Sequence, residues 1–374
     1  MNVHARRKEL LSIAAQVAKA VPGKLAAMEL QGIHMEADAA RGLVTLTATN
    51  HEVAIRSSVQ ATVETGGSAV LNDGLLLGLL SKMPEDTVTF ALQESGRLRV
   101  ESGKAVFEIS ALSGDQYPMP ELPFPEDAVA VQGIPSLSRR AVFAAADAST
   151  NPAINCVKLS LGTDGLKANA CDGVCLAEAQ GDKECTGQVS FLLPATSLAM
   201  LASISRDSDV YEMGLTGSGV VFWDGTLLFS ARLMNSSYPD TEQMFKAVAH
   251  KYVAQVQAEE FLDAIDAVTV MEDAASRLEM TWQAHALTLC CRSKYGESQK
   301  SLPAMIASAP DKPLYYNGAR LRECLRTLKG AVTLSCSTEG HMILEAEGFR
   351  YLQVALRPSK PKAVPAPKKA KKAA

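Results

Sequence analysis

Apolar residues along the chain follow two spacings, one typical of helices and one typical of strands. Spacings of three and four residues predict helices over Leu10–Val21, Leu137–Ala148 and Phe261–Met271. Strict alternation predicts half-buried strands, as in Arg97–Ser102 and Ala284–Cys291. Both patterns recur throughout the chain, which predicts an α+β protein.

The same order of elements occurs three times. Segments that begin near positions 70, 192 and 315 each contain a short strand, a turn or capping residue, an apolar helix and another strand. Leu76, Leu198 and Leu321 take equivalent places in the three helices. A repeat of this size is too long for a solenoid unit, which has roughly 20–45 residues. We therefore expect three similar domains.

Other landmarks keep the same register. Asn50 at the end of GLVTLTATN matches Asp172 at the end of GLKANACD, and Tyr117 before a proline matches Tyr238 before another. The predicted domains are residues 1–125, 126–246 and 247–358, each with two helices packed on antiparallel sheets. Residues 359–374 are predicted to be a disordered basic tail of Pro, Lys and Ala.

Charge is distributed unevenly between the tail and the rest of the chain. The formal charge is −4, and the six lysines of PSKPKAVPAPKKAKKAA contribute +6, so residues 1–357 carry −10. The tail could contact nucleic acid or an acidic surface, or it could remain solvated without a specific partner.

Several classes of protein are disfavoured. The eight cysteines have no CxxC spacing and the six histidines are scattered, so we expect buried thiols, no metal and no cofactor. No nucleotide loop, nucleophile elbow or HExxH motif occurs, so no catalytic residue is proposed and we expect no enzyme activity. We also expect no membrane span and no signal peptide, which makes the cytoplasm the expected location.

Basic residues lie on the predicted helices of this otherwise acidic chain. Arg322, Arg326 and Lys329 follow one another at spacings of four and three, which would place them on one face of a regular helix. Arg139 lies on an earlier helix. Such residues indicate local attraction to phosphates, although a solvated helix face is an equal alternative for any one of them.

One helix has the opposite charge. The segment before and within Phe261–Met271 carries Glu259, Glu260, Asp263 and Asp266. This pattern disfavours a contact between that helix and DNA.

Several segments resemble the bacterial DNA polymerase III beta subunit, the sliding clamp. The resemblance spans the chain from Met1 to about Pro358, and its more specific parts are LTATNHEVAI, LKANACDGVCLAEA, LLFSARLMNSSYPD and YLQVALRP. The chain is similar to a divergent member. It has CDGVCL where the family usually has Thr-Asp-Gly-His-Arg-Leu, and it has ALRP where the family often has Met-Pro-Met-Arg-Leu.

The resemblance implies a DNA clamp fold and a function. Members of the family are head-to-tail homodimers in which each chain forms half of a closed ring around duplex DNA, with helices lining the hole. They bind DNA independently of its sequence, are loaded by a clamp loader, and tether the catalytic subunit of the polymerase so that synthesis is processive. Tethering raises the local concentration of the polymerase without a strong contact.

The family also binds short peptides of its partners in an apolar groove between the second and third domains. An alternative for each residue carried over is a role in the core of its own domain, and Gln243 and Arg320 stand where the family pattern differs. The resemblance places these residues in the groove: Ile154, Cys171, Gly173, Val174, Leu176, Pro239, Met244, Asn317, Leu352, Val354 and Leu356.

Two further sites follow from the resemblance. Lys24 stands where the family has a basic residue on a loop that reaches DNA. The family joins domain one of one subunit to domain three of the other, which nominates Phe107 and Ile109 on the first surface and Val268 and Val270 on the second.

An alternative function is a clamp-shaped interaction scaffold that is not loaded on DNA. The departures in CDGVCL and ALRP and the acidic helix favour this alternative. The sequence leaves open which polymerase or loader is the partner, and whether the protein serves a chromosome or a mobile element.

Overall fold

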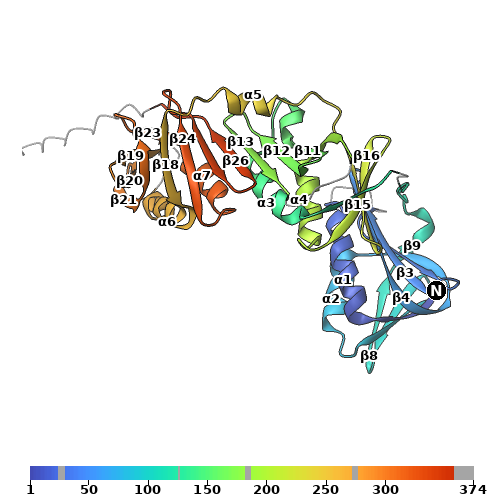
Figure 1. Ribbon diagram of the computed structural model, residues 1–374. Coiled ribbons are helices and arrows are strands. Elements are labelled where there is room, and N and C mark those ends of the chain that lie inside the picture. Colours follow the sequence, from blue (N-terminus) through green and yellow to red (C-terminus); the bar gives the residue numbers. More distant parts are fainter. Residues whose placement is uncertain (24–29, 125–126, 182–186, 272–276, 358–374) are drawn as a thin grey trace, which may run out of the picture. The chain divides into compact units, whose positions relative to one another are not determined.

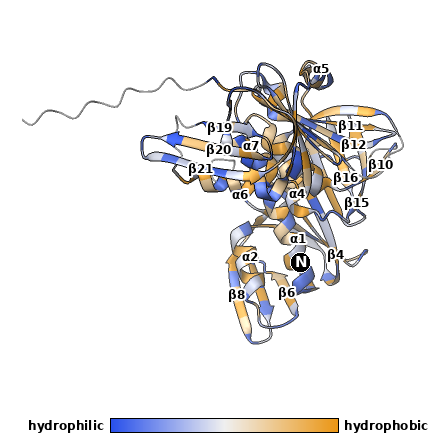
Figure 2. Cartoon of the chain, turned by 60° about the vertical axis from the view of Figure 1, so that its left-hand side comes forward, coloured by the Kyte–Doolittle hydropathy of each residue, from blue (hydrophilic) through white to orange (hydrophobic). Residues whose placement is uncertain are grey.

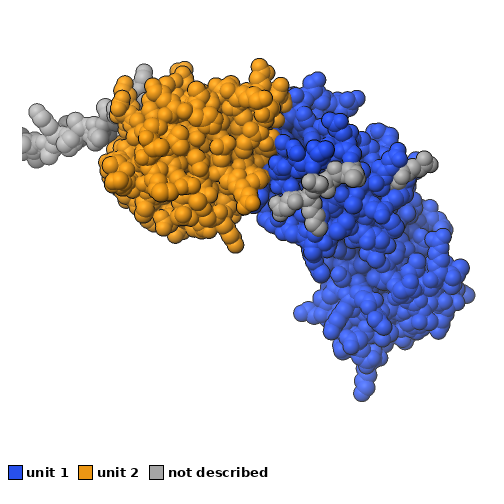
Figure 3. All heavy atoms as spheres, in the orientation of Figure 1, with its two compact units in different colours: residues 1–170, 179–238 blue, residues 171–178, 239–374 orange. Residues whose placement is uncertain are grey.

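The computed structural model describes residues 1–23, 30–124, 127–181, 187–271 and 277–357. Lys24 and the tail lie outside these residues. The chain forms two compact units, and each takes part of its chain from two places in the sequence (Figure 3). Unit 1 contains Met1–Ala170 and Ala179–Tyr238, and unit 2 contains Cys171–Glu178 and the chain from Pro239 onward.

The described residues form seven α-helices (Figure 1). In unit 1, α1 packs against α2 and α3 packs against α4, while in unit 2 α6 packs against α7. No described helix is long and apolar enough to cross a membrane. The helices are α1 (Arg7–Val17), α2 (Asp73–Lys82), α3 (Ile134–Ala141), α4 (Ala195–Ile204), α5 (Thr241–Lys246), α6 (Ala258–Val268) and α7 (Gly318–Leu325).

Unit 1 is built on two groups of antiparallel strands. The larger group has the order β10-β15-β16-β17-β4-β1-β6-β7-β8, with β3, β2, β5 and β9 continuing from β4, and the smaller has the order β14-β11-β12. Its strands are β1 (Asn2–Arg6), β2 (Ile33–Asp38), β3 (Leu43–Thr49), β4 (Val53–Thr65), β5 (Gly67–Leu71), β6 (Thr87–Leu92), β7 (Arg97–Ser102), β8 (Ala105–Ser110), β9 (Leu112–Ser113), β10 (Val129–Gln132), β11 (Cys156–Gly162), β12 (Gly165–Cys171), β14 (Val189–Pro194), β15 (Val210–Thr216), β16 (Gly219–Trp223) and β17 (Leu227–Arg232).

Unit 2 also contains two groups of strands. One has the order β13-β26-β25-β24-β18-β22 and the other the order β21-β20-β19-β23. Apolar and polar residues interleave along the strands of both units, as Figure 2 shows for β11 and β12 of unit 1. The strands of unit 2 are β13 (Cys175–Gln180, within the unit as far as Glu178), β18 (Tyr252–Gln257), β19 (Leu278–Gln283), β20 (Ala286–Ser293), β21 (Gly296–Pro303), β22 (Met305–Ser308), β23 (Leu314–Tyr316), β24 (Ala331–Cys336), β25 (Met342–Ala346) and β26 (Phe349–Gln353).

The first helix of each predicted repeat begins and ends earlier than the sequence indicated. Each α-helix gives way to a 3-10 turn, at residues 18–20, 142–144 and 269–271. The tighter turn satisfies carbonyl groups at the end of the helix by bonds between residues three apart. The apolar spacing continues through these turns, so spacing alone did not locate the helix ends.

Turns at matching positions of the first two predicted repeats have the same hydrogen bonds. Asn50 accepts hydrogen bonds from the N–H groups of Glu52 and Val53 at 3.0 and 2.7 Å. Asp172 accepts them from Val174 and Cys175, both at 2.8 Å. A short polar side chain that bonds to the backbone two and three residues later fixes a tight turn between strands. The equivalent leucines Leu76, Leu198 and Leu321 are all buried.

The expectation of buried thiols is confirmed for the described cysteines. Burial raises the pKa of Cys175 and of Cys336 to about 12, which keeps both thiols protonated and unreactive at neutral pH. The described cysteines are all buried: Cys156, Cys171, Cys175, Cys290, Cys291, Cys324 and Cys336.

Candidate functional site

Arg139 lies on α3 with an exposed side chain. Its guanidinium donates to Asp207 at 2.9 Å and to the Ser136 hydroxyl at 2.9 Å. Burial alone would raise the pKa of Asp207, but hydrogen bonds from Arg139 and Ser136 outweigh it and hold that pKa below its ordinary value. Arg139 therefore has a fixed position while 60% of its side chain faces solvent.

The predicted basic face of the last helix is wrong in its geometry. Helix α7 ends at Leu325, so Arg326 is the residue after the helix and Lys329 lies in the following loop. The N–H of Leu328 bonds to the carbonyl of Leu325 at 3.0 Å, and Gly330 then turns the chain with φ +73°. The N–H of Arg326 still bonds to the carbonyl of Arg322 at 3.0 Å, so these two residues keep the helical spacing. Lys329 lies beyond the last turn, so the three basic residues do not share one helix face.

Arg322 is part of the contact between α6 and α7. Its Nε is 2.8 Å from Asp266 on α6, and its guanidinium also donates to the Thr269 hydroxyl. Only 22% of the side chain is exposed. The ion pair offsets the charge of Arg322, which makes this residue a weaker candidate for a phosphate contact than the sequence indicated.

The acidic residues of α6 fall into two groups. Asp266 pairs with Arg322, and the carboxylate of Glu259 accepts the N–H of Gly330 at 3.0 Å. Glu260 and Asp263 are exposed on the same helix. Half of this acidic pattern therefore ties α6 to its neighbours within unit 2.

The helices of unit 1 present further basic residues. Lys8 opens α1 with 78% of its side chain exposed, and its ammonium group lies 4.0 Å from Asp86. Lys82 is exposed in the last turn of α2. Arg7, by contrast, donates to the carbonyls of Leu80 and Glu85, both at 3.0 Å, and so closes the C-terminal end of α2.

Most of the predicted peptide-groove residues lie in unit 2. Val174 is 41% exposed and Met244 39% exposed, and Pro239, Val354 and Leu356 are half-buried. We call these five residues the candidate peptide surface. Their side chains can offer apolar contacts without unfolding any element.

The other members of the predicted groove have different places. Cys171, Leu176 and Leu352 are buried, as the alternative of a core role described. Gly173 is exposed with φ +88°, a conformation that glycine adopts without a steric penalty. Ile154, half-buried in a 3-10 turn, belongs to unit 1.

Backbone hydrogen bonds hold the C-terminal members of this surface, Val354 and Leu356, in place. The N–H of Val354 donates to the carbonyl of Val174 at 2.9 Å, and the N–H of Leu356 donates to Tyr315 at 2.7 Å. The N–H of Ala355 donates to Nδ1 of His341 at 3.2 Å. Three consecutive residues are thus anchored before the chain reaches Pro358.

Asp172 and Asn317 fix the neighbouring loop and helix. Besides its turn, Asp172 is 2.8 Å from the guanidinium of Arg320 on α7. Asn317 caps α7 by accepting the N–H of Arg320 at 3.2 Å, and its carbonyl accepts the side-chain amide of Gln353 at 3.0 Å. Asn317 therefore supports the surface by capping, as the turn or capping position of the third repeat indicated.

Of the four residues nominated for a dimer interface, three are at least partly exposed and one is buried. Phe107 is 39% exposed and Ile109 half-buried on β8, the last strand of its group, so this edge is open within the described residues. Val270 is 81% exposed. Val268 is 1% exposed, so its assignment to an interface is wrong. The spacing of Phe261, Ala264, Ile265 and Val268 already placed it on the core face of α6.

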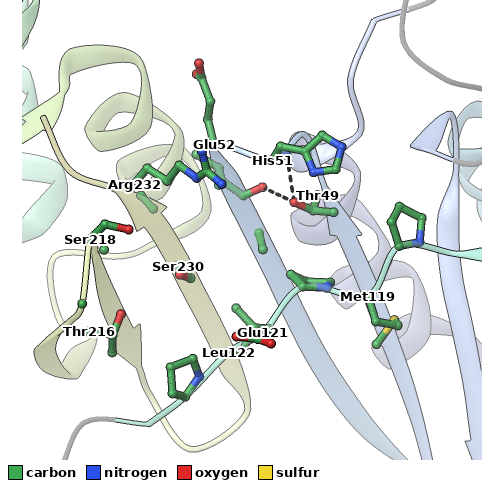
Figure 4. A pocket seen from close by; sticks show the side chains of 18 residues that line it. Thr49, His51, Glu52, Met119, Glu121, Leu122, Thr216, Ser218, Ser230 and Arg232 are labelled. Carbon is green, nitrogen blue, oxygen red and sulfur yellow. Dashed lines mark hydrogen bonds between the residues drawn. The ribbon is translucent and has the colours of Figure 1, made fainter.

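Unit 1 contains a cavity of about 720 Å³ that the sequence did not indicate (Figure 4). Its wall includes the hairpin at Gly217, which joins β15 and β16, and the proline-rich stretch that ends at Pro123. Arg232 and His51 lie at one side of the cavity, and the carboxylate of Glu52 points away from it. No acid–base pair or nucleophile is assembled among these residues.

Comparisons with known proteins agree with this geometry. Residues 1–123 match the family model described as DNA polymerase III beta subunit, N-terminal domain. The beta sliding clamp of Bacillus subtilis is 28% identical over 72% of this chain and 74% of its own length. That of Synechococcus elongatus is 26% identical over 88% of this chain and 90% of its own.

Solved structures extend the match to nearly the whole chain. A putative DNA polymerase III beta subunit from Eubacterium rectale has a TM-score of 0.88 at 20% identity and covers 95% of this chain and 99% of its own. The DNA polymerase sliding clamp of Bacillus subtilis has a TM-score of 0.87 at 22% identity and covers 96% and 100%. The chain has the fold of a beta sliding clamp. The predicted resemblance is confirmed.

Within this clamp fold the divergent CDGVCL segment keeps its turn and changes its side chains. Asp172 and Gly173, which match the family pattern, form the turn itself. Cys171 and Cys175, which depart from it, are buried, and Val174 departs from it at an exposed position. Val174 therefore alters the exposed surface of this segment, the two cysteines alter its interior, and the turn itself is kept.

Proposed function

We propose that this protein is a DNA sliding clamp that encircles duplex DNA as a homodimer and tethers the replicative polymerase. The observation that carries the proposal is the fold, which matches solved sliding clamps over nearly their whole length with TM-scores of 0.86 and above for the Bacillus subtilis and Thermotoga maritima proteins. A clamp of this kind is a processivity factor with no chemistry of its own. It works where bacterial DNA is replicated, in the cytoplasm.

We further propose that each chain is divided as residues 1–125, 126–246 and 247–358. Three helix pairs support this division, α1 with α2, α3 with α4 and α6 with α7. The 3-10 turn after the first helix of each pair supports it as well. Two chains would then supply six similar domains to the ring.

DNA would be held loosely through its phosphates. Arg139, Arg326 and Lys329 have exposed side chains, and we assign them this role together with Lys24, and with Arg322 as the weakest member. Contacts to phosphates do not depend on base sequence, so a closed ring can slide along the duplex. Topological closure then replaces tight binding.

The open edge of β8 supports the homodimer. Phe107 and Ile109 lie on this edge strand, and exposed apolar residues on an unpaired edge favour pairing with another chain. We assign Val270, but not Val268, to the opposite surface of the partner.

Polymerase and clamp loader would bind through short peptides on the candidate peptide surface. An apolar surface flanked by fixed polar groups suits leucine and phenylalanine side chains. Val174→Asp should abolish binding of a polymerase-derived peptide. Leu176→Ala is a poorer test, because Leu176 is buried and its loss would also weaken the core.

Loading on DNA tests the proposal as a whole. The purified protein and its clamp loader are incubated with nicked circular DNA, and retention is followed by gel filtration before and after the DNA is cut. We expect retention on circles and release from linear DNA, with a dimer by light scattering. A monomer that is never retained on circles would refute the clamp.

A second candidate is a clamp-shaped scaffold that is not loaded on DNA. The exposed Glu260 and Asp263 on α6 favour it, because they would repel phosphates. Peptide binding without any loading by the cognate loader would select this candidate.

A further inference from the structure

Helix α5 carries part of the candidate peptide surface and is too short to be stable alone. It has six residues, Thr241–Lys246, whereas isolated helices shorter than roughly 12–15 residues are marginal in water. Asp240 caps it by accepting the N–H of Gln243 at 3.0 Å, and Phe245 is 3% exposed. Met244 points outward at 39% exposure, so its position depends on what holds the helix.

Arg350 holds this helix to the sheet of unit 2. It lies on β26, and its Nε and Nη2 both donate to one oxygen of Glu178, at 2.9 and 2.6 Å. Nη2 also donates to Glu242 in the first turn of α5 at 2.7 Å. The centre of its guanidinium lies 4.4 Å from the centroid of the Phe245 ring, within range of a cation–π contact.

The same arginine satisfies a buried charge. Glu178 on β13 is 8% exposed, and a buried carboxylate requires a partner because desolvation penalises its charged form. On the exposed side, the hydrogen bond from Arg350 is the main cause that lowers the pKa of Glu242, so Glu242 stays ionised at neutral pH. One planar guanidinium can make both contacts at once because its five N–H groups form a fixed fork.

We propose that Arg350 is a positioning residue for partner binding, which joins β13, β26 and α5 so that Met244 is held beside the rest of the candidate peptide surface. This inference rests on the proposed function. Arg350 itself does not need to touch the peptide. Its two carboxylate partners lie 172 and 108 residues away in the sequence, on segments that flank Val174 and include Met244.

The proposal has a consequence that apolar packing alone would lack. The Arg350–Glu242 contact is half exposed, with 30% and 50% of the two side chains facing solvent, so salt screens it. Affinity for an apolar peptide should therefore fall as salt rises, even though the peptide makes no charged contact with Arg350. Removing Glu242 should remove that part of the salt dependence.

Glu242→Gln tests the link to α5 and leaves the pair of Arg350 with Glu178 intact. The matched control is Glu297→Gln, because Glu297 is 53% exposed, pairs with Arg292 at 3.0 Å, and lies on β21 outside the candidate peptide surface. The full chain is titrated into a fluorescein-labelled ten-residue polymerase peptide with leucine and phenylalanine anchors, and binding is followed by anisotropy.

We expect Glu242→Gln to weaken binding about three- to tenfold at low salt, about 50 mM, chiefly through faster dissociation. At about 500 mM salt the variant and the wild type should converge. Its melting temperature should stay within about 2 °C of the wild type, because the lost contact is solvent-exposed. Glu297→Gln should bind like the wild type at both salt concentrations.

Arg350→Lys provides a second measurement. Lysine keeps the positive charge but loses the planar fork, so binding should weaken, and adding Glu242→Gln to it should weaken binding little further. Wild-type affinity of Glu242→Gln at low salt, equal weakening at both salt concentrations, or equal weakening by Glu297→Gln would each overturn the proposal.

Val174→Asp separates this inference from the proposed function. If Val174→Asp abolishes binding while Glu242→Gln does not change it, only the role of Arg350 is refuted. If Val174→Asp leaves binding unchanged, the candidate peptide surface itself is refuted.

Discussion

Helices α1 in unit 1 and α6 in unit 2 bury apolar residues at the same spacing but carry net charges of opposite sign. Both bury residues at spacings of three and four, Leu10, Ile13 and Val17 in α1 and Phe261, Ile265 and Val268 in α6 among them. Helix α1 begins with Arg7 and Lys8 followed by Glu9, whereas α6 has Glu259 and Glu260 and no base in its first turn. The fold requires the apolar face, and the charge on the other face is free to differ.

The charges in the first turn of α6 are those that helix stability favours. The N-terminal end of a helix has a partial positive charge, so acids there stabilise it and bases destabilise it by about 0.3–1 kcal/mol each. The carboxylate of Glu259, in this first turn, accepts the N–H of Gly330. Lys8 in α1 is therefore placed against its local preference.

The buried apolar faces of the two helices predict the largest effects. Phe261→Ala should lower the free energy of unfolding by about 3–5 kcal/mol and Leu10→Ala by about 2–5 kcal/mol, because both side chains are fully buried. Denaturant titration with hydrogen exchange on each unit would measure both. A loss below about 1 kcal/mol at either site would show that the two helices are not packed equivalently.

The opposite charges predict the next largest effects. Extending the proposed DNA contact to Lys8 on α1, we expect that replacing Lys8 and Arg139 together with glutamine weakens DNA binding about tenfold and reduces the salt slope by nearly two, since each phosphate contact contributes about 0.9. Replacing Glu260 and Asp263 with lysine should strengthen binding. Fluorescence titrations over a range of salt concentrations would reveal either change, and unchanged slopes would remove α1 and α3 from the DNA contact.

The pair between α6 and α7 predicts a smaller effect. Asp266→Asn removes the carboxylate that lies 2.8 Å from Arg322, and should lower the free energy of unfolding by about 0.5–1.5 kcal/mol. Asp263→Asn on the same helix is the control, since its carboxylate is exposed. Equal melting temperatures for the two variants would contradict a role of Arg322 in packing.

The smallest expected effect is on acid stability in unit 1. The pKa of Asp207 is lowered in the folded protein, so its contribution to stability is present above the ordinary carboxyl pKa of about 4 and is lost as the pH falls further. Because the side chain is half exposed, the effect is small. When melting temperature is measured at decreasing pH, its fall on the acid side should be less steep for Asp207→Asn than for the wild type. An unchanged slope would exclude the contribution.

The α+β class and the threefold order of elements could be predicted because they depend on local spacing, whereas the clamp fold followed from the resemblance of several segments to a known family. Equivalent turns at Asn50 and Asp172 follow from side chains that bond to their own loops. The roles of Arg322 and Arg350 could not be predicted, because their partners lie far away in the sequence. The burial of Val268 was predictable from its spacing, which the assignment to an interface overlooked.

Unit 2 draws its segment Cys171–Glu178 from a part of the chain that is synthesised well before the rest. Glu178 and its partner Arg350 are 172 residues apart. At about 5–20 residues per second, the ribosome needs roughly 10–30 seconds to make that stretch. During this interval β13 lacks its neighbour β26, and the carboxylate of Glu178 lacks its partner Arg350. Unit 2 can complete its fold only after β26 has been synthesised, and a protein expressed from Pro239 onward would lack β13.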